Sequence, residues 1–368
     1  MILFPPAATP RLIVKIGSAL LVDGAGAVRR DWLAGVASDI AERARAGQQV
    51  AVVSSGAIAL GARRLNLPKG GRACLEDAQA AAACGQIALA GVWAELLAAE
   101  GLTAAQMLVT LDDLEDRRRY LNASATLDRL LTLGVVPVIN ENDSVATEEI
   151  RFGDNDRLAA RVAQAAGAGG VILLSDIDGL YDRNPADPAA QHIARVERID
   201  AAIEAMADSR SASGMGSGGM VSKIAAARIA ASAGCDLAIV SGRCEHPLSV
   251  PARHTMFVAV AGASAHKAWL AGGLTAKGRV TIDAGAVRAL RSGASLLAAG
   301  VTAITGRFER GDVLEIDGPD GRTMARGLSE YPAPDAARIM GLGRDAQEAA
   351  LGYTPRSAMV HRDHLVLL

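Results

Sequence analysis

The chain is poor in aromatic residues, cysteine and histidine. Phe, Trp and Tyr together make up 3% of its 368 residues, so the core must consist mainly of Ala, Val, Leu and Ile, which suits close packing of helices on a sheet. The four cysteines, Cys74, Cys84, Cys235 and Cys244, form no CxxC pair. We therefore expect buried thiols in a reducing compartment, and neither a disulfide framework nor a zinc site.

The chain also lacks an excess of charge of one sign. Lys and Arg total 38 against 40 Asp and Glu, so a polyanion-binding surface over the whole molecule is not expected. The Pro-containing start shows no signal-peptide pattern, and no apolar stretch of membrane-spanning length lacks polar interruption. These features favour a cytoplasmic protein, and the length favours two domains.

Two common phosphate-binding motifs are missing. There is no GxxxxGK[ST] segment and no GxGxxG after the first predicted strand, which excludes a P-loop and leaves a Rossmann site without support. The segment DIDGLYDRNP (176–185) begins like a calcium loop, but a strand precedes it, Tyr181 replaces the turn glycine and no Glu closes it. It is either a loop at the edge of a nucleotide site or a plain turn.

Short apolar runs alternate with amphipathic stretches over most of the chain. We predict strands at 11–16, 49–55, 135–139, 171–175 and 236–242, and helices at 31–46, 76–100, 112–133, 154–168 and 221–234. This alternation predicts an α/β fold with a mainly parallel sheet sandwiched by helices. We expect this domain to span 1–265, a Gly-rich linker to span 266–277, and a small β-rich domain with a hairpin turn at IDGPDG to span 278–368.

Polar residues and glycines follow four predicted strands at the point where each strand ends. These ends are Lys15 to Ser18, Ser54-Ser55-Gly56, Asn140 to Asp143, and Ser175-Asp176. Because ligands of such sheets bind beyond the carboxyl ends of the strands, we expect the four segments to converge on one edge.

The segment GMGSGGMVSK (214–223) is the candidate phosphate site. Its glycines let backbone N–H groups approach a ligand, and the helix that follows contributes its N-terminus and Lys223. A flexible linker is the alternative. Against it, the run adjoins an amphipathic helix, and a lysine stands where the helix dipole disfavours a cation. Lys15 either extends to the surface or reaches the same site, and its place at a strand end favours the site.

Three polar residues, Asp154, Asn155 and Asp156, open a predicted helix. One of them is expected as the N-cap, but a cap needs only one residue. A carboxylate between lysines would hold both ammonium groups in position. No histidine lies at these strand ends, which suits an acceptor that is already an anion and needs no general base.

An amino acid fits the remaining polar groups. Asp143 with Asn140 and Asn155 can bind an ammonium group, and the Ser55-Gly56 turn offers hydroxyl and N–H donors to a carboxylate.

These segments resemble the glutamate 5-kinase family, which has the amino acid kinase fold and a C-terminal PUA domain. The matching segments span nearly the whole chain in the family's order: VKIGS (14–18), SSGAIALG (54–61), QMLVT…DLEDRRRYLNA (106–123), VPVINENDSVAT (135–147), FGDNDRLAA (152–160), LLSDIDGLY (173–181) and GMGSGGMVSKIAAA (214–227).

The resemblance implies an enzyme that transfers the ATP γ-phosphoryl group to the glutamate side-chain carboxylate, the first step of proline synthesis. It implies that Lys15 and Lys223 bracket the phosphoryl group, that Asp156 orients them, and that magnesium is held mainly by ATP phosphates. It further implies inhibition by proline, a homo-oligomer (dimer or tetramer) and handover of the product to a reductase.

The resemblance also assigns the binding residues. Ser55, Asp143 and Asn155 would bind glutamate. The ATP-binding residues would be Lys15, Ser175, Asp176, Ser217, Gly218, Gly219, Met220, Val221, Ser222 and Lys223. Ser54 and Ser175 stand where Thr is common in the family, which is a mild change.

Two alternatives remain from the sequence. One is another kinase of the same fold, acting on aspartate, acetylglutamate, carbamate or UMP; the ammonium pocket opposes UMP and an acetylated amine. The other is an RNA-binding PUA protein. From Arg279 to the end there are 11 Arg and no Lys against 11 Asp and Glu, so an RNA-binding groove is not expected. A role of this domain in assembly or regulation is preferred.

Overall fold

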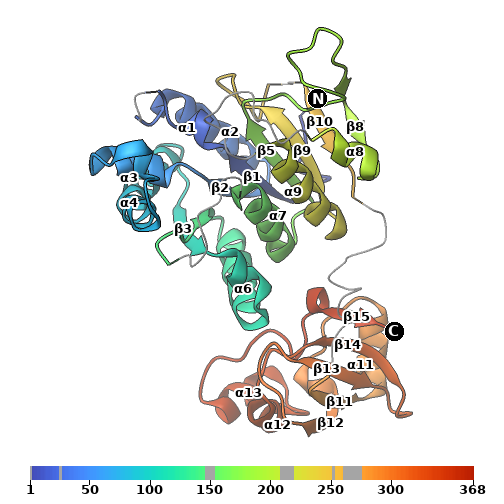
Figure 1. The fold of residues 1–368 in the computed structure, drawn as a ribbon. Coiled ribbons are helices and arrows are strands. Elements are labelled where there is room, and N and C mark those ends of the chain that lie inside the picture. Colours follow the sequence, from blue (N-terminus) through green and yellow to red (C-terminus); the bar gives the residue numbers. More distant parts are fainter. Residues whose placement is uncertain (1, 25–26, 146–153, 208–218, 251–252, 260–275) are drawn as a thin grey trace. The chain divides into compact units, whose positions relative to one another are not determined.

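The computed structural model describes residues 2–24, 27–145, 154–207, 219–250, 253–259 and 276–368. The chain divides into two compact units, Met1–Ala261 and Gly262–Leu368, each with its own hydrophobic core (Figure 1).

The first unit is built on an eight-stranded sheet with the order β3-β4-β2-β1-β5-β9-β10-β8. Its strands are β1 (Arg11–Ile16), β2 (Gln49–Ser54), β3 (Ala104–Val109), β4 (Val136–Glu141), β5 (Gly170–Ser175), β8 (Arg195–Val196), β9 (Asp236–Ser241) and β10 (His254–Phe257). All neighbours from β3 to β9 are parallel, whereas β10 is antiparallel to β9. The predicted mainly parallel sheet is thus confirmed. A separate ribbon pairs β6 (Leu180–Tyr181) with β7 (His192–Ile193).

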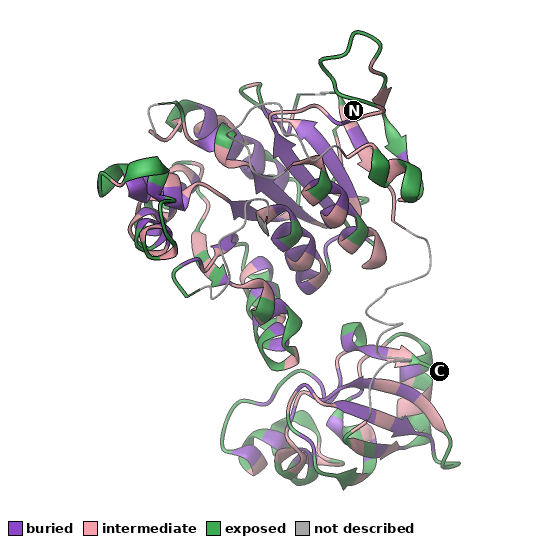
Figure 2. Ribbon diagram, in the orientation of Figure 1, coloured by how far each residue is buried: buried purple, intermediate pink, exposed green. Residues whose placement is uncertain are grey.

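Helices cover both faces of this sheet. The described helices of this unit are α1 (Ser18–Leu21), α2 (Arg30–Arg45), α3 (Ala57–Arg64), α4 (Leu75–Ala99), α5 (Leu111–Glu115), α6 (Arg117–Thr132), α7 (Asp154–Ala166), α8 (Ala201–Ala205) and α9 (Met220–Ser232), with a 3-10 turn at Pro68–Gly71. Helices α2 and α4 pack on one face of the sheet. Every second residue of the strands, such as Leu12, Val14 and Ile16 of β1, belongs to the same hydrophobic core as these helices. Helices α6, α7 and α9 lie on the other face of the sheet (Figure 1), and Figure 2 shows the sheet between the helices as largely buried. Lys15 faces this side, since its ammonium group contacts Asp156 of α7.

By length and composition, helix α4 could cross a membrane, but the helices of a protein core can have the same length and composition. Helix α4 buries Leu89, Trp93 and Leu97 in the core of the first unit.

Some helices differ from the prediction. The expected helix at 112–133 is interrupted, because Asp116 caps α6 by accepting the Arg119 N–H at 3.0 Å. Thr110 and Asp113 form a capping box at the start of α5. Helix α3 was not predicted. It begins after Gly56, which has φ +99° and therefore a conformation that other residues avoid.

The Pro-containing N-terminal segment packs on the first unit. Phe4 is buried, and its carbonyl accepts from Arg43 at 3.2 Å and from Gln48 at 3.0 Å. Arg43 of α2 is itself buried and also donates to the carbonyls of Leu3 and Leu248. This segment, which the sequence left unassigned, is thus anchored by a buried guanidinium.

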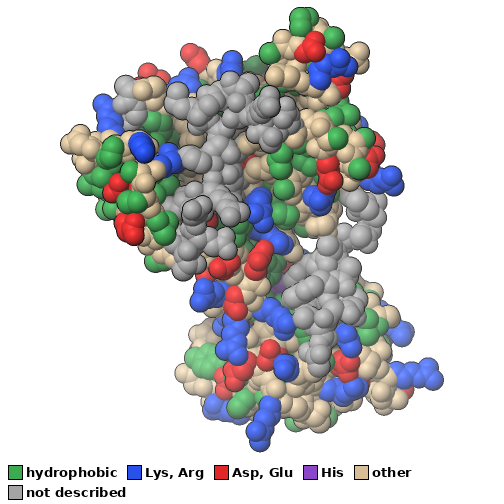
Figure 3. All heavy atoms as spheres, viewed as in Figure 1, with side chains coloured by type: hydrophobic (Ala, Val, Ile, Leu, Met, Phe, Trp, Pro, Cys, Tyr) green, Lys and Arg blue, Asp and Glu red, His purple; other side chains and the backbone are tan. Residues whose placement is uncertain are grey.

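The second unit is a five-stranded sheet with the order β12-β11-β13-β14-β15. Its elements are β11 (Gly278–Ile282), α11 (Ala284–Arg291), β12 (Val301–Gly306), β13 (Val313–Asp317), β14 (Thr323–Leu328), α12 (Ala333–Ile339), α13 (Arg344–Leu351) and β15 (Leu365–Leu367). The predicted hairpin is confirmed between β13 and β14. On the face in Figure 3, the basic and acidic side chains of this unit are interspersed.

The cysteines are less buried than expected. All four are free thiols, but only Cys235 is buried, and Cys74 is exposed at the N-cap of α4. The expectation of four buried thiols is therefore wrong, because Cys74 precedes α4, Cys84 lies on a partly exposed side of α4 and Cys244 follows the end of β9.

Candidate active site

Two lysines from distant parts of the sequence meet on one carboxylate. Lys15 Nζ lies 2.5 Å from Asp156 Oδ1, and Lys223 Nζ lies 2.9 Å from Asp156 Oδ2. All three side chains are buried, with 8%, 1% and 7% of their side-chain surfaces exposed for Lys15, Asp156 and Lys223. The structure thus brings together the three residues expected to surround the phosphoryl group.

Three secondary-structure elements position this cluster. Lys15 is on β1, Asp156 is in the first turn of α7, and Lys223 is in the first turn of α9. The N-terminal dipole of α7 favours Asp156, while that of α9 disfavours Lys223. The ion pair offsets the second effect. Helices α7 and α9 pack against each other, which brings their first turns together.

Burial and mutual attraction oppose each other in this cluster. Burial lowers the pKa of Lys15, the Asp156 carboxylate opposes that change, and the Lys223 charge adds to it. Burial disfavours the ionised form of Asp156, but the two ammonium groups outweigh it and hold the pKa of Asp156 below its ordinary value. One carboxylate between two ammonium groups leaves a net charge of about +1 in a buried place, which favours an anionic ligand.

A chain of hydrogen bonds links three of the residues expected to hold an amino acid. Asn155 Nδ2 donates to Ser55 Oγ at 3.0 Å and to Asn140 Oδ1 at 3.2 Å. Asn140 Oδ1 also accepts the Glu141 N–H at 2.9 Å. Asn155 Oδ1 is buried and accepts no hydrogen bond from the described residues. A buried oxygen that accepts no hydrogen bond favours the binding of a ligand with a cationic N–H donor, such as an ammonium group.

Asp143 lies in the wall of a hollow of about 270 Å³. The hollow lies between α4, β3 and the end of β4, and its lining is Ala82, Ala83, Gln86, Ile87, Gln106, Leu108, Glu141, Asn142, Asp143 and Ser144. Asp143 is buried, and Arg72 lies close enough for the two charges to attract each other. The hollow is large enough for a small amino acid.

The expected nucleotide residues lie at the ends of β5 and α9. Ser175 Oγ donates to Asp176 Oδ1 at 3.1 Å, and the Asp176 charge acts on Lys15. Gly219 is the N-cap of α9, and its carbonyl accepts from the Ser222 and Lys223 N–H groups at 3.0 and 3.4 Å. Met220 and Val221 form the first turn of α9. Ser217, Gly218 and the Asp154 side chain lie outside the described residues.

Sequence reasoning missed two residues of α4 that support the site. Trp93 Nε1 donates to Ser54 Oγ at 3.1 Å, and Gln86 Nε2 donates to the Glu141 carbonyl at 3.3 Å. Their spacing of seven residues predicts that both lie on one face of the helix, but it does not predict which strand ends they contact.

No group of three or more His, Cys, Asp or Glu side chains within the described ranges is arranged to hold a metal ion. The Asp156 carboxylate forms ion pairs with both Lys15 and Lys223.

Comparisons with known proteins cover both units. A model of the amino acid kinase family matches residues 10–241, and a PUA domain model matches residues 278–348. The chain is 82% identical over 368 residues to the glutamate 5-kinase of Sphingopyxis alaskensis, with 100% of both chains covered. It is 63% identical to that of Zymomonas mobilis subsp. mobilis (99% of this chain, 93% of the relative). It is 61% identical to that of Novosphingobium aromaticivorans (98% and 96%).

Proposed function

Because the chain belongs to the amino acid kinase family, we propose that it transfers the γ-phosphoryl group of ATP to the side-chain carboxylate of L-glutamate, giving L-glutamyl 5-phosphate and ADP. The observation that carries this proposal is the pair of buried ammonium groups of Lys15 and Lys223 on one Asp156 carboxylate. The glutamate 5-kinase relatives support glutamate as the acceptor.

In the proposed reaction a glutamate carboxylate oxygen forms a bond to the γ-phosphorus while the bond to the β–γ bridging oxygen breaks. The acceptor is already an anion, so no general base is required. Lys15 and Lys223 stabilise the negative charge on the phosphoryl oxygens, and Asp156 keeps both ammonium groups in position. Bound Mg²⁺ would neutralise further charge, and we propose that the ATP phosphates provide most of its ligands.

We propose that Asp143, Asn140 and Asn155 bind the substrate ammonium group. The buried Asn155 Oδ1 supports this, since an ammonium group would give it a donor. Ser55 and the Gly56 N–H would bind a substrate carboxylate. The hollow beside Asp143 gives room for the part of the amino acid that does not react.

We propose that Ser175, Asp176 and the segment from Ser217 to Lys223 bind ATP. The N-terminus of α9 supports this, because helix N-termini suit phosphate oxygens. The domain limits 1–265 and 278–368, joined by 266–277, and a cytoplasmic location remain part of the same proposal.

Inhibition by proline and delivery of the product to a reductase are further parts of the proposal. A homo-oligomer is supported by an exposed apolar stripe on α4, formed by Ala83, Ile87, Gly91, Ala94 and Ala98, in which Ile87 is 75% exposed. RNA binding is not proposed, because the interspersed charges of the second unit in Figure 3 give no single-sign groove on that face.

The proposal is tested by trapping the acyl phosphate with hydroxylamine, in the presence of ATP, Mg²⁺ and a panel of amino acids. We expect hydroxamate from L-glutamate, and little from aspartate or N-acetylglutamate. Release of ADP from ATP without any hydroxamate would contradict acyl transfer, and a preference for another acid would contradict the acceptor.

A further inference from the structure

Two buried tryptophans each hold the end of a strand at the edge of the sheet where the polar residues gather. Trp32 and Trp93 are 5% and 0% exposed. They lie on α2 and α4, which pack against each other on the face opposite Lys15. Each indole N–H donates to a different strand end. Burying an indole N–H requires such a partner, but the partner need not lie beside a ligand site.

Trp93 acts on the acceptor side of the site. Its N–H donates to Ser54 Oγ at 3.1 Å, and Ser54, the last residue of β2, is fully buried. The next residue, Ser55, accepts from Asn155 of α7, on the other face of the sheet. The Ser54-Ser55 turn is thus held from both faces. Gln86, two turns before Trp93 on α4, holds the Glu141 carbonyl at the end of β4.

The packing of α3 on α4 holds the same turn. Gly61 of α3 and Gly85 of α4 lie where the helices cross, and a Cβ at Gly61 would lie 1.7 Å from the Ala81 oxygen. Since α3 begins immediately after Gly56, α4 fixes both the last residue of β2 and the helix that follows the turn.

Trp32 acts on the nucleotide side. Its N–H donates to the Gly242 carbonyl at 2.8 Å and to the Cys244 carbonyl at 2.9 Å. Gly242 in turn donates its N–H to the Ser175 carbonyl at 2.8 Å. The Trp32 indole is therefore connected to the end of β5 through the backbone of a single residue, Gly242.

We propose that Trp93 and Trp32 are positioning residues with separate effects: Trp93 positions the amino-acid pocket and Trp32 positions the nucleotide pocket. Neither touches a substrate, and each acts through the strand end to which it donates. The proposal rests on the proposed function, which assigns glutamate to one pocket and ATP to the other. Loss of one indole N–H lets one strand end move, so the binding of one substrate weakens.

The test uses Trp93→Phe and Trp32→Phe, which keep an aromatic ring and remove the donor. We expect Trp93→Phe to raise the KM for glutamate roughly three- to tenfold, the size expected from one lost hydrogen bond, with the KM for ATP changed less than about twofold. Trp32→Phe should raise the KM for ATP roughly three- to tenfold and change the KM for glutamate less than about twofold. Each variant is the matched control for the other, and melting temperatures are measured for both.

Ser54→Ala removes the acceptor of the Trp93 bond without opening a large cavity. Ser54→Ala should raise the KM for glutamate as much as Trp93→Phe does. The double variant Ser54→Ala/Trp93→Phe should show no larger KM for glutamate than either single variant, because both changes remove the same hydrogen bond. If Trp93→Phe does not fold, Ser54→Ala alone tests whether the Trp93–Ser54 bond positions the amino-acid pocket. Trp32→Phe tests whether Trp32 positions the nucleotide pocket. Equal shifts of both KM values in each variant, or lower melting temperatures with unchanged KM values, would overturn the inference.

The two proposals fail in different ways. An active wild-type chain whose variants show no division between substrates overturns only the positioning roles. A wild-type chain that forms no glutamyl hydroxamate overturns the proposed function, and the assignment of Trp93 to a glutamate pocket is overturned with it.

Discussion

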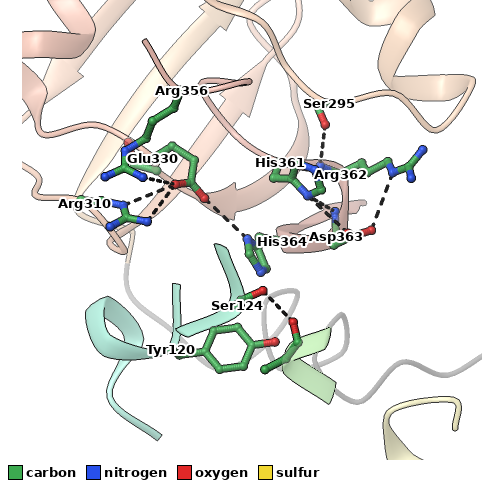
Figure 4. Close-up of polar contacts among 12 residues, drawn as sticks. Tyr120, Ser124, Ser295, Arg310, Glu330, Arg356, His361, Arg362, Asp363 and His364 are labelled. Carbon is green, nitrogen blue, oxygen red and sulfur yellow. Dashed lines mark hydrogen bonds and ion pairs between the residues drawn. The ribbon is translucent and has the colours of Figure 1, made fainter. Parts of the chain in front are cut away.

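Each unit has a carboxylate that contacts several basic side chains, but the chemistry of the two clusters differs. In the first unit Asp156 holds two lysines. In the second unit Glu330 lies among two arginines and a histidine (Figure 4). Arg310 Nη2 lies 3.3 Å, Arg356 Nη1 3.9 Å and His364 Nδ1 3.7 Å from its carboxylate oxygens.

The difference indicates which cluster is kept for a ligand. Lysine carries a compact, strongly hydrated charge, and one Asp156 carboxylate can neutralise only one of the two buried ammonium groups, so an anionic ligand is favoured beside them. Arginine offers several N–H groups in one plane and suits a fixed bridge between segments. The Glu330 cluster joins residues on either side of β13 and β14 with the chain that leads to β15, and Arg356 is 39% exposed. We therefore expect loss of function from changes in the first cluster and loss of stability from changes in the second.

The largest effect is expected at Lys223. Lys223→Ala should lower kcat by roughly 10²-fold or more, because it removes a cation aimed at charge that develops in the transition state. Steady-state kinetics on protein of unchanged melting temperature measure this. A fall in kcat of less than about threefold would show that Lys223 has no catalytic role. The Asp156 cluster would then not differ from the Glu330 cluster in serving catalysis.

Asp143→Ala should mainly raise the KM for glutamate, by roughly tenfold or more, because a charge-assisted hydrogen bond to the ammonium group is lost. Titration of each substrate at saturating concentration of the other measures this. An effect confined to the KM for ATP would mean that the pocket beside Asp143 holds the other ligand.

Glu330→Ala should destabilise the second unit by about 1–2 kcal/mol, because the partly buried Arg310 loses its partner while the more exposed Arg356 contributes little. Calorimetry measures the change, and kcat of the folded enzyme at low temperature should stay within about twofold of wild type. A loss of kcat at full folding would show that the second cluster also serves catalysis.

The same cluster gives a pH dependence. Burial opposes ionisation of Glu330, but His364 and Arg310 outweigh it and lower the pKa of Glu330. A carboxylate whose folded pKa is lowered stabilises the fold above its unfolded pKa, about 4.3 for Glu. This contribution is lost as pH falls through the lower, folded pKa. Glu330→Ala should therefore make the unfolding midpoint of the second unit less sensitive to acid below about pH 4.

The smallest effect is expected from removing the second unit. A fragment ending at residue 265 should keep kinase activity within a few-fold of wild type, since the proposed catalytic residues all come from the first unit and each unit has its own core. Complete inactivity of a folded fragment would show that the second unit contributes to the site.

The sequence predicted the central strands well, because β1, β4 and β5 are buried on both faces and each contains a short apolar run. Strand β3 was missed, since it is a half-exposed edge strand with Gln106 and Leu108 on its surface. The break between α5 and α6 was also missed, because Asp116 fits a helical pattern until its capping role is seen.

The site was predictable in its chemistry more than in its contacts. Lys223 could be recognised by its unfavourable place at a helix N-terminus. The choice of Asp156 over its neighbours came from the family resemblance, not from the residues alone. The bond from Trp93 to Ser54 was not predictable, because a Trp in an apolar helix indicates core packing, and the pairing depends on how α4 crosses the sheet.

The most direct measurement is the turnover of Asp156→Asn, which keeps the shape of the side chain and removes the charge that holds both lysines. We expect kcat to fall by roughly 10²-fold or more, with KM values for both substrates changed less than about threefold, since the amide cannot hold two ammonium groups in the transition-state arrangement. A folded Asp156→Asn protein that turns over at the wild-type rate would contradict a catalytic role for the two lysines on this carboxylate.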